Sequence, residues 1–220
     1  MAKFDINGNL RGKIDDFSFY VDKNGNQVVR KIVKKRVLKT PKQLASRAKF
    51  ALVNKKMSPL NNVIKKGFKG DAKVYRKAVS NAYHEAIAGE YPKFIFQYSK
   101  VKIADGKLEI PRKFSALADE DFNRVSFTWS VEPNDTLQGE PNNGHNEKML
   151  KGRADDKINI VCFNENYPNE IKTFSSKRRT DGEAVIFLPD DWTADKTHIW
   201  IYLTSWDFME NSESVYQRVN

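Results

Sequence analysis

The segment "HIWIYLTS", residues 198–205, says most about the fold of this chain. Its apolar residues alternate with a period of two, which is typical of a β-strand whose successive side chains point to opposite sides. Three aliphatic residues share one side and are expected to point into a core: Ile199, Ile201 and Leu203. Trp200 and Tyr202 then share the other side. We expect them to be packed as well or, if that side is exposed, to form a contact surface.

Similar short strands, without an intervening helix, are predicted along the rest of the C-terminal half. They are expected at residues 94–111 (two strands joined by a turn at Asp105-Gly106), 123–130, 157–164, 170–175, 183–189, 198–205 and 214–219. Val125, Phe127 and Trp129 are expected to point inward. The series predicts an immunoglobulin-like or fibronectin-like antiparallel β-sandwich over residues 91–220. A long polar loop at residues 131–156 interrupts it and is expected to be functional, disordered or shaped by a neighbouring molecule.

A helix is predicted to begin at Thr40. Thr40 suits the N-cap, Pro41 suits the first helical position, and Gln43 completes a capping box. The helix is expected to run to about Met57 and to be apolar on two sides, so that it packs on two sides. Further helices with single apolar stripes are predicted at residues 60–69 and 71–89, the second ending at Gly89.

A β-hairpin is predicted before these helices, within residues 15–33. Phe17, Phe19 and Val21 alternate on its first strand, and Asn24-Gly25 suits a type I′ turn. A second turn is expected at residues 7–9. The predicted fold class is therefore α+β, with a hairpin-plus-helices module at residues 1–90 and the sandwich at 91–220.

Charge is unevenly distributed along the chain, whose net charge is +10. Residues 1–100 contain 23 Lys/Arg and 7 Asp/Glu, whereas residues 101–220 contain 15 and 21. The segment "VVRKIVKKRVLKTPKQLASRAKF", residues 28–50, contains no acidic residue. Such asymmetry favours an anionic partner for the N-terminal half. A basic domain next to an acidic one, without a specific role, is the alternative.

The candidate binding residues are basic side chains that could follow a phosphate track or dock onto a protein neighbour. They are Arg30, Lys31, Lys34, Lys35, Arg36, Lys39, Lys42, Lys65, Lys66, Lys69, Lys177, Arg178 and Arg179. The last three are expected to form a smaller loop patch. Sequence-specific base recognition is not indicated, because zinc-finger, basic-zipper and RNA-recognition motifs are missing.

Catalytic and cofactor motifs are missing as well, so we expect no enzyme and no cofactor. His84 is not part of a zinc-protease H-E-x-x-H motif, and phosphate-binding glycine motifs do not occur. Cys162, the single cysteine, is expected to be buried and unreactive. The acidic residues around Trp192 are expected to lie on the surface. No segment resembles a secretory signal or a membrane span, so a cytoplasmic site of synthesis is expected.

Several motifs resemble an uncharacterised family that is widespread in Bacteroidota. They include Gly12-Lys13, Val29-Arg30, Thr40, Pro41, Gln43, Arg47, Phe50, Ser58, Gly67-Phe68, Tyr91-Pro92, Tyr98-Ser99 and Gly106, with "TDGEAVIFLPDDW" and "HIWIYLTS" in the C-terminal half. The resemblance implies a basic N-terminal module and a β-rich C-terminal half, and it brings no activity. The segment "TPKQLASRAKF" also resembles proteins of phage and prophage structural clusters.

From these patterns we expect a non-enzymatic structural or accessory subunit of a larger assembly, such as a phage-type particle. The basic module would anchor it to a protein neighbour or to packaged nucleic acid. A cytosolic nucleic-acid-binding protein of low sequence specificity is the alternative. A homo- or hetero-oligomer is expected in the first case, and a membrane is not expected as a partner.

Overall fold

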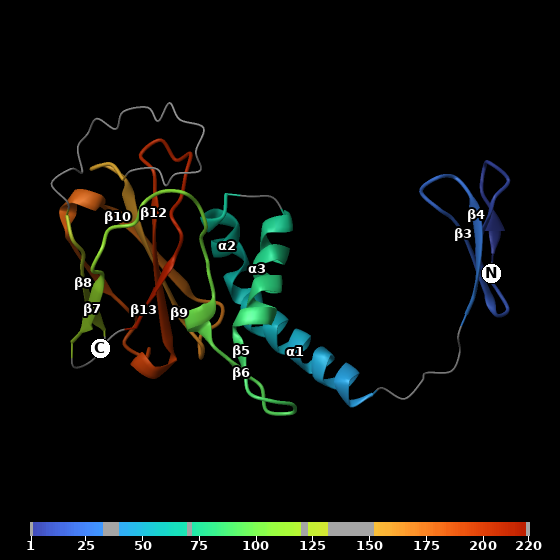
Figure 1. Ribbon diagram of the computed structural model, residues 1–220, viewed down its shortest axis with the longest axis horizontal. Helices are drawn as coiled ribbons and strands as arrows, with labels where there is room; N and C mark the ends of the chain where they lie inside the picture. The colour runs from blue at the N-terminus through green and yellow to red at the C-terminus, as the bar shows by residue number, and fades with distance from the viewer. Residues whose placement is uncertain (1, 33–39, 70–71, 120–122, 132–151, 219–220) are drawn as a thin grey trace. The chain divides into compact units, whose positions relative to one another are not determined.

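The computed structural model describes residues 2–32, 40–69, 72–119, 123–131 and 152–218. It is an α+β structure of helices and antiparallel sheets (Figure 1). The chain divides into two compact units, Met1–Leu44 and Ala45–Asn220. This division differs from the predicted boundary at residue 90, because the helices share a hydrophobic cluster with the C-terminal sheet. Most of the long polar loop lies outside the described residues.

The first unit contains a sheet in which consecutive strands are neighbours and antiparallel, in the order β1-β2-β3-β4. The predicted hairpin is confirmed as β3 and β4, with Phe19 opposite Val29. The sequence patterns did not predict β1 and β2. The strands are β1 Lys3–Phe4, β2 Leu10–Ile14, β3 Phe17–Val21 and β4 Gln27–Lys31.

The loops Asp5–Asn9 and Asp22–Asn26 are built alike. In each loop, the N–H of the first residue (Asp) donates to the carbonyl of the last residue (Asn), at 2.8 and 3.0 Å. The Gly N–H donates to the Asp carbonyl, at 3.0 and 3.1 Å. Each Asp Oδ1 also accepts two backbone N–H groups. Positive φ occurs at Gly8 and Gly25, whereas a type I′ turn needs it at two successive residues. The type I′ prediction is therefore wrong, because the Asp side chain stabilises a longer loop.

The helical region begins with the predicted capping box. The Gln43 N–H donates to Thr40 Oγ1 at 3.3 Å, and the Thr40 N–H donates to Gln43 Oε1 at 3.2 Å. The prediction of two-sided packing is wrong for this first helix: Val53 and Met57 are buried, but Phe50 is exposed, because only its C-terminal half meets the core. The helices are α1 Pro41–Met57, η1 Ser58–Leu60, α2 Asn61–Gly67 and α3 Ala72–Glu85.

The chain after α3 is less regular than predicted. Strand β5 (Ile87–Ala88) pairs with β6 (Ile95–Phe96), so the third helix ends before Gly89. The prediction of two strands at residues 94–111 is wrong beyond β6. A short helix, η2 (Tyr98–Lys100), follows, and single contacts then hold the chain, such as the Ile103 N–H donating to Ser214 Oγ at 2.9 Å.

The other predicted strands are confirmed, and they form two antiparallel sheets with the orders β10-β9-β12-β13 and β11-β8-β7. Strand β7 was not predicted. The strands are β7 Ser115–Ala118, β8 Arg124–Thr128, β9 Lys157–Asn164, β10 Ile171–Arg178, β11 Glu183–Phe187, β12 Thr197–Thr204 and β13 Val215–Gln217, with short helices η3 Arg179–Asp181 and η4 Ala194–Lys196 between them.

The two sheets share one hydrophobic cluster. The residues predicted to point inward all belong to it: Val125, Phe127, Trp129, Ile199, Ile201 and Leu203. Cys162 is buried in the same cluster, and burial raises the pKa of its thiol.

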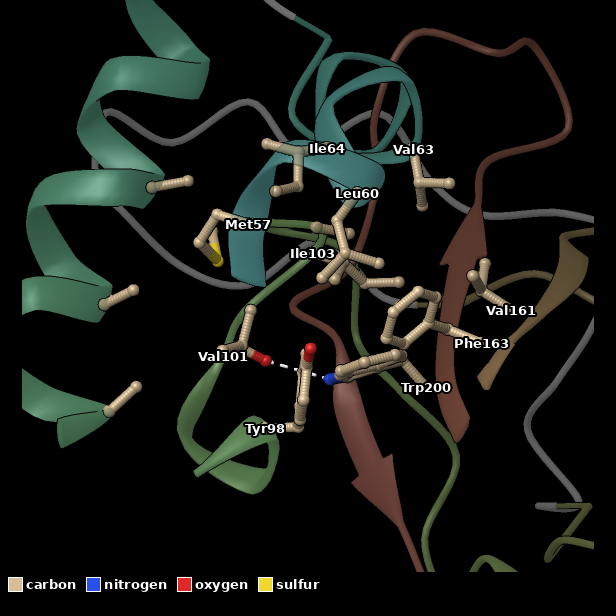
Figure 2. Close-up of a cluster of buried hydrophobic side chains, with 14 of the residues drawn as sticks. Met57, Leu60, Val63, Ile64, Tyr98, Val101, Ile103, Val161, Phe163 and Trp200 are labelled. Atoms are coloured by element: carbon tan, nitrogen blue, oxygen red, sulfur yellow. Dashed lines mark hydrogen bonds between the residues drawn. The ribbon is translucent and has the colours of Figure 1, made fainter. Parts of the chain in front are cut away.

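The opposite side of β9 and β12 contributes to a second cluster, shared with the helices (Figure 2). Trp200 and Tyr202 lie in it together with Met57 and Ile64. The Trp200 indole N–H donates to the Val101 carbonyl at 2.9 Å. The aromatic pair is therefore packed, and the alternative of an exposed contact surface is wrong. Among the described residues, no helix combines the length and apolar character needed to cross a membrane.

Candidate binding surfaces

Strand pairing gives the N-terminal sheet two chemically different faces. Because side chains alternate along each strand and paired residues share a face, the register assigns every residue of the sheet to one side. One side, here the apolar face, carries Phe4, Leu10, Ile14, Phe17, Phe19, Val21 and Val29. The other, here the basic face, carries Lys3, Arg11, Lys13 and Arg30, together with Ser18, Tyr20 and Val28.

Within the first unit, no second layer covers the apolar face in the described residues. Phe4 is 75% exposed and Val29 52% exposed, while Phe17 is 44% exposed. Among the described residues of Met1–Leu44, not one is buried. A sheet normally covers its apolar side with another layer, and contiguous exposed apolar patches mark interaction sites. This face is therefore a candidate protein contact.

The basic face assembles residues that are distant in sequence. Arg11 forms an ion pair with Asp5, with 2.9 Å between Arg11 Nε and Asp5 Oδ2. Of the predicted site residues, Arg30 lies on this face, but its neighbour Lys31 lies on the apolar side, because the strand alternates. Sequence reasoning missed Lys3, Arg11 and Lys13. The alternation in "LRGKI", residues 10–14, is the signal that could have found two of them.

The remaining predicted residues are spread over several elements. Lys34, Lys35, Arg36 and Lys39 lie outside the described residues. Lys42 is exposed in the first turn of α1, and Lys65 and Lys66 are exposed on α2. Lys69 donates a hydrogen bond to the Phe208 carbonyl, and burial lowers the pKa of its ammonium group. Lys69 is thus engaged within its own unit.

The predicted loop patch at residues 177–179 is not formed as expected. Lys177 and Arg178 end strand β10, but the Arg179 side chain is buried, with 2% of the residue exposed. Its Nη1 donates to the Glu109 carbonyl at 2.7 Å, and its carbonyl accepts from Trp129 Nε1 at 2.7 Å. The expectation of an exposed Arg179 is wrong, because this residue ties β8 and the segment before β7 together.

A polar cluster that the sequence did not reveal joins α1 to the sheet. Glu165 accepts a hydrogen bond from Lys56 and lies 3.2 Å from His198 Nε2. His198 Nδ1 lies 3.0 Å from the Tyr216 hydroxyl, and its ring stacks on Tyr98 with 4.1 Å between centroids. These residues are far apart in sequence, and no local motif links them.

Burial sets the protonation of this cluster. It lowers the pKa of His198 despite the nearby Glu165 carboxylate, so the imidazole is neutral near pH 7. Burial also opposes ionisation of Glu165, but hydrogen bonds from Lys56 and His198 outweigh it and hold that pKa below its usual value. Since Lys56, Glu165 and His198 are all hydrogen-bonded, the arrangement ties α1 to the sheet.

A groove of about 460 Å³ lies between α1 and α3. It is lined by Phe50 and Asn54 from α1 and by Tyr75, Arg76, Val79, Ser80 and Tyr83 from α3. Neither a histidine, a cysteine nor a carboxylate lines it. In the described part of the chain, no group of three or more His, Cys, Asp or Glu residues is placed to hold a metal ion.

The sequence matches a family of unknown function, DUF6266, over residues 24–218. The chain belongs to this family. The match includes β4, the helices and both C-terminal sheets, and it leaves out β1 to β3. No curated protein and no solved structure matches the chain.

Proposed function

We propose that the protein is a non-enzymatic subunit of a larger assembly and that copies of it associate through the apolar face of the N-terminal sheet. The observation that supports this is the exposure of Phe4, Phe17 and Val29 on one side of a sheet without a described buried residue. Contiguous exposed apolar patches of this kind mark sites of interaction. A partner that covers this face completes the unit.

A second copy suits the apolar face. Two sheets pack face to face at a spacing of about 10 Å, with their strands nearly aligned. The charged residue on this side of the described strands, Lys31, ends β4 and is paired with Phe17. In a two-fold arrangement the two Lys31 side chains can lie at opposite corners, so that the apolar centres meet.

The size of the face predicts weak individual contacts. Five-residue strands are about 17 Å long, and neighbouring strands lie about 4.8 Å apart. The face is therefore much smaller than the roughly 800 Å² per partner of stable complexes. Weak contacts that are repeated in an assembly reinforce one another. The phage-type nature of the assembly rests on the short likeness of "TPKQLASRAKF" and belongs to the proposal.

The C-terminal unit would offer such a subunit a second surface for contacts. We propose that its two sheets form an immunoglobulin-like sandwich, a proposal supported by their antiparallel pairing and shared cluster. The exposed residues on the outer side of β11, Val185 and Phe187, would be available to neighbours there.

Light scattering of the full chain across a wide concentration range tests the assembly proposal. The mass should rise with concentration, and Phe17→Ser should return it to that of one chain. Tyr20→Ser is the matched control, since Tyr20 lies on the same strand, on the basic face, and is 46% exposed against 44% for Phe17. A single-chain mass at every concentration, or equal effects of the two changes, would contradict the proposal.

Binding of nucleic acid is the second candidate, because the register gathers Lys3, Lys13 and Arg30 on one face. Neutralised phosphates release counterions, so affinity should fall steeply with salt. Fluorescence anisotropy with labelled duplex DNA in a salt series tests this. Lys13→Ala with Arg30→Ala should flatten the slope by about 0.9 per lost phosphate contact. Lys31→Ala, on the opposite face, should leave the slope unchanged.

A further inference from the structure

The groove between α1 and α3 has an apolar floor with helical spacing. Tyr75, Val79 and Tyr83 follow one another at intervals of four residues on α3, and Phe50 faces them from α1. Two such intervals span about 12 Å along a helix axis. The floor is therefore long enough to contact two turns or more of another helix.

The floor of the groove adjoins the hydrophobic cluster that the helices share with β9 and β12. Val79 is 8% exposed and belongs to that cluster, whereas Phe50, at the rim, is 58% exposed. Tyr83 is half-buried and its hydroxyl lies 3.4 Å from Ser46 Oγ, which fixes the ring at one end of the groove. The groove thus combines a rigid base with an exposed aromatic side chain, a combination found at protein contacts.

Two basic residues lie at this apolar floor. Arg76 lines the groove, and Lys49 Nζ lies 5.7 Å from the centre of the Tyr83 ring. Helix α1 has no acidic residue, and α3 has one, Glu85, as its last residue. Within the described residues, no ion pair involves Arg76 or Lys49. The rim therefore has an uncompensated positive charge.

We propose that this groove binds an amphipathic helix with acidic flanks, supplied by a partner protein. Apolar residues spaced along one side of that helix would cover Phe50, Val79 and Tyr83, and its carboxylates would meet the basic rim. A second copy of α1 or α3 would bring like charge to the rim. A nucleic acid would leave the apolar floor uncovered. The proposal is independent of the association through the N-terminal sheet.

A pair of synthetic peptides tests the proposal with the full chain. Each has about 18 residues, or five helical turns, with Leu along one side and either Glu or Lys at the other positions. In fluorescence anisotropy the Glu peptide should bind, with an affinity that falls as salt is added, and the Lys peptide should not. Equal binding of both peptides, or binding of neither, would overturn the proposal.

Variants at exposed positions locate the binding site without disturbing the core. Phe50→Asp removes the aromatic rim residue, and Ser80→Trp fills the groove from an exposed position; each should weaken binding of the Glu peptide about tenfold or more. Arg76→Glu should weaken it far more than Lys55→Glu, an identical charge change on α1 outside the groove. Circular dichroism confirms folding. Folded Phe50→Asp and Ser80→Trp proteins that bind like the wild type would overturn the proposal.

Discussion

The two units of this chain rely on different interactions. In Ala45–Asn220, two hydrophobic clusters hold side chains as large as Trp192, Trp200 and Phe127 at 2% exposure or less. In Met1–Leu44, every described residue is at least partly exposed. Ala45–Asn220 is stabilised by the removal of apolar surface from water. Met1–Leu44 gains little stability in this way.

The N-terminal sheet instead depends on hydrogen bonds at its turns. The Asp5 and Asp22 carboxylates each accept two backbone N–H groups, and Gln27 exchanges two hydrogen bonds with the Leu10 backbone across the sheet. Local hydrogen bonds fix strand register even where side chains are exposed. Strand register and burial are therefore specified by separate residues: turn residues fix the register, and apolar residues fix what is buried.

The largest expected effect comes from Trp200. Its indole is fully buried and bonded to Val101, so Trp200→Ala leaves a cavity and an unpaired carbonyl, at a cost of about 3–5 kcal/mol in the free energy of unfolding. Phe17→Ala, in the exposed sheet, should change the main transition by less than about 0.5 kcal/mol. Chemical denaturation followed by circular dichroism measures both. Equal effects would remove the distinction between the units.

Substitutions at two glycines test two different requirements: close packing at Gly106 and a positive φ at Gly25. A Cβ at Gly106 would overlap the Asn211 carbonyl, so Gly106→Ala should cost about 1–3 kcal/mol in the main transition. Gly25 has a φ of 87° and open space around it, so Gly25→Ala strains only its own turn. Thermal unfolding should reveal the first change, and amide hydrogen exchange in β3 and β4 the second. A main transition shifted by Gly25→Ala would contradict this assignment.

Strong acid should loosen the N-terminal sheet. Hydrogen bonds from the Asn26 backbone, above all, lower the pKa of Asp22 from its ordinary 3.8, so its contribution is complete above that pH and is lost as the pH falls through the lowered pKa. Amide exchange in β3 and β4, recorded between neutral and strongly acidic pH, measures this. Asp22→Asn keeps the acceptor without the charge, and its turn should lose the pH dependence.

The smallest effect is expected from His198. Burial lowers its pKa below the ordinary 6.5, so the unfolded chain takes up a proton that the folded protein does not. The free energy of unfolding should therefore fall as the pH drops below 6.5 towards the folded pKa, in a range where Glu165 stays ionised. Denaturation curves at two pH values should differ less in His198→Gln than in the wild type. If the variant and the wild type show the same change in the free energy of unfolding between the two pH values, other groups cause the pH dependence.

Local patterns predicted much of the fold. The capping box at Thr40 and Gln43 and the alternation of Val125, Phe127 and Trp129 depend on residues a few positions apart, and both are confirmed. The same local patterns did not predict segments that are held by long-range contacts. Residues 94–111 alternate like a strand, yet they are held by separate bonds to residues near 211–214.

The candidate surfaces were harder to predict than the fold. A run of basic residues indicated a phosphate track, but strand alternation places Arg30 and Lys31 on opposite sides. A smaller patch was expected at residues 177–179, but Arg179 is buried. The apolar face depends on the pairing of β1 with β2, which the weak pattern of those short strands did not indicate. The groove requires α1 and α3 to be neighbours, a property of the tertiary fold.

The matching loops at Asp5–Asn9 and Asp22–Asn26 also have an evolutionary consequence. Because two five-residue loops hold the register of the N-terminal sheet, substitutions on either face need not disturb its backbone. Selection can then change the chemistry of either face while the scaffold persists. The exposed residues between the loops can therefore change faster than the strand register that the loops hold.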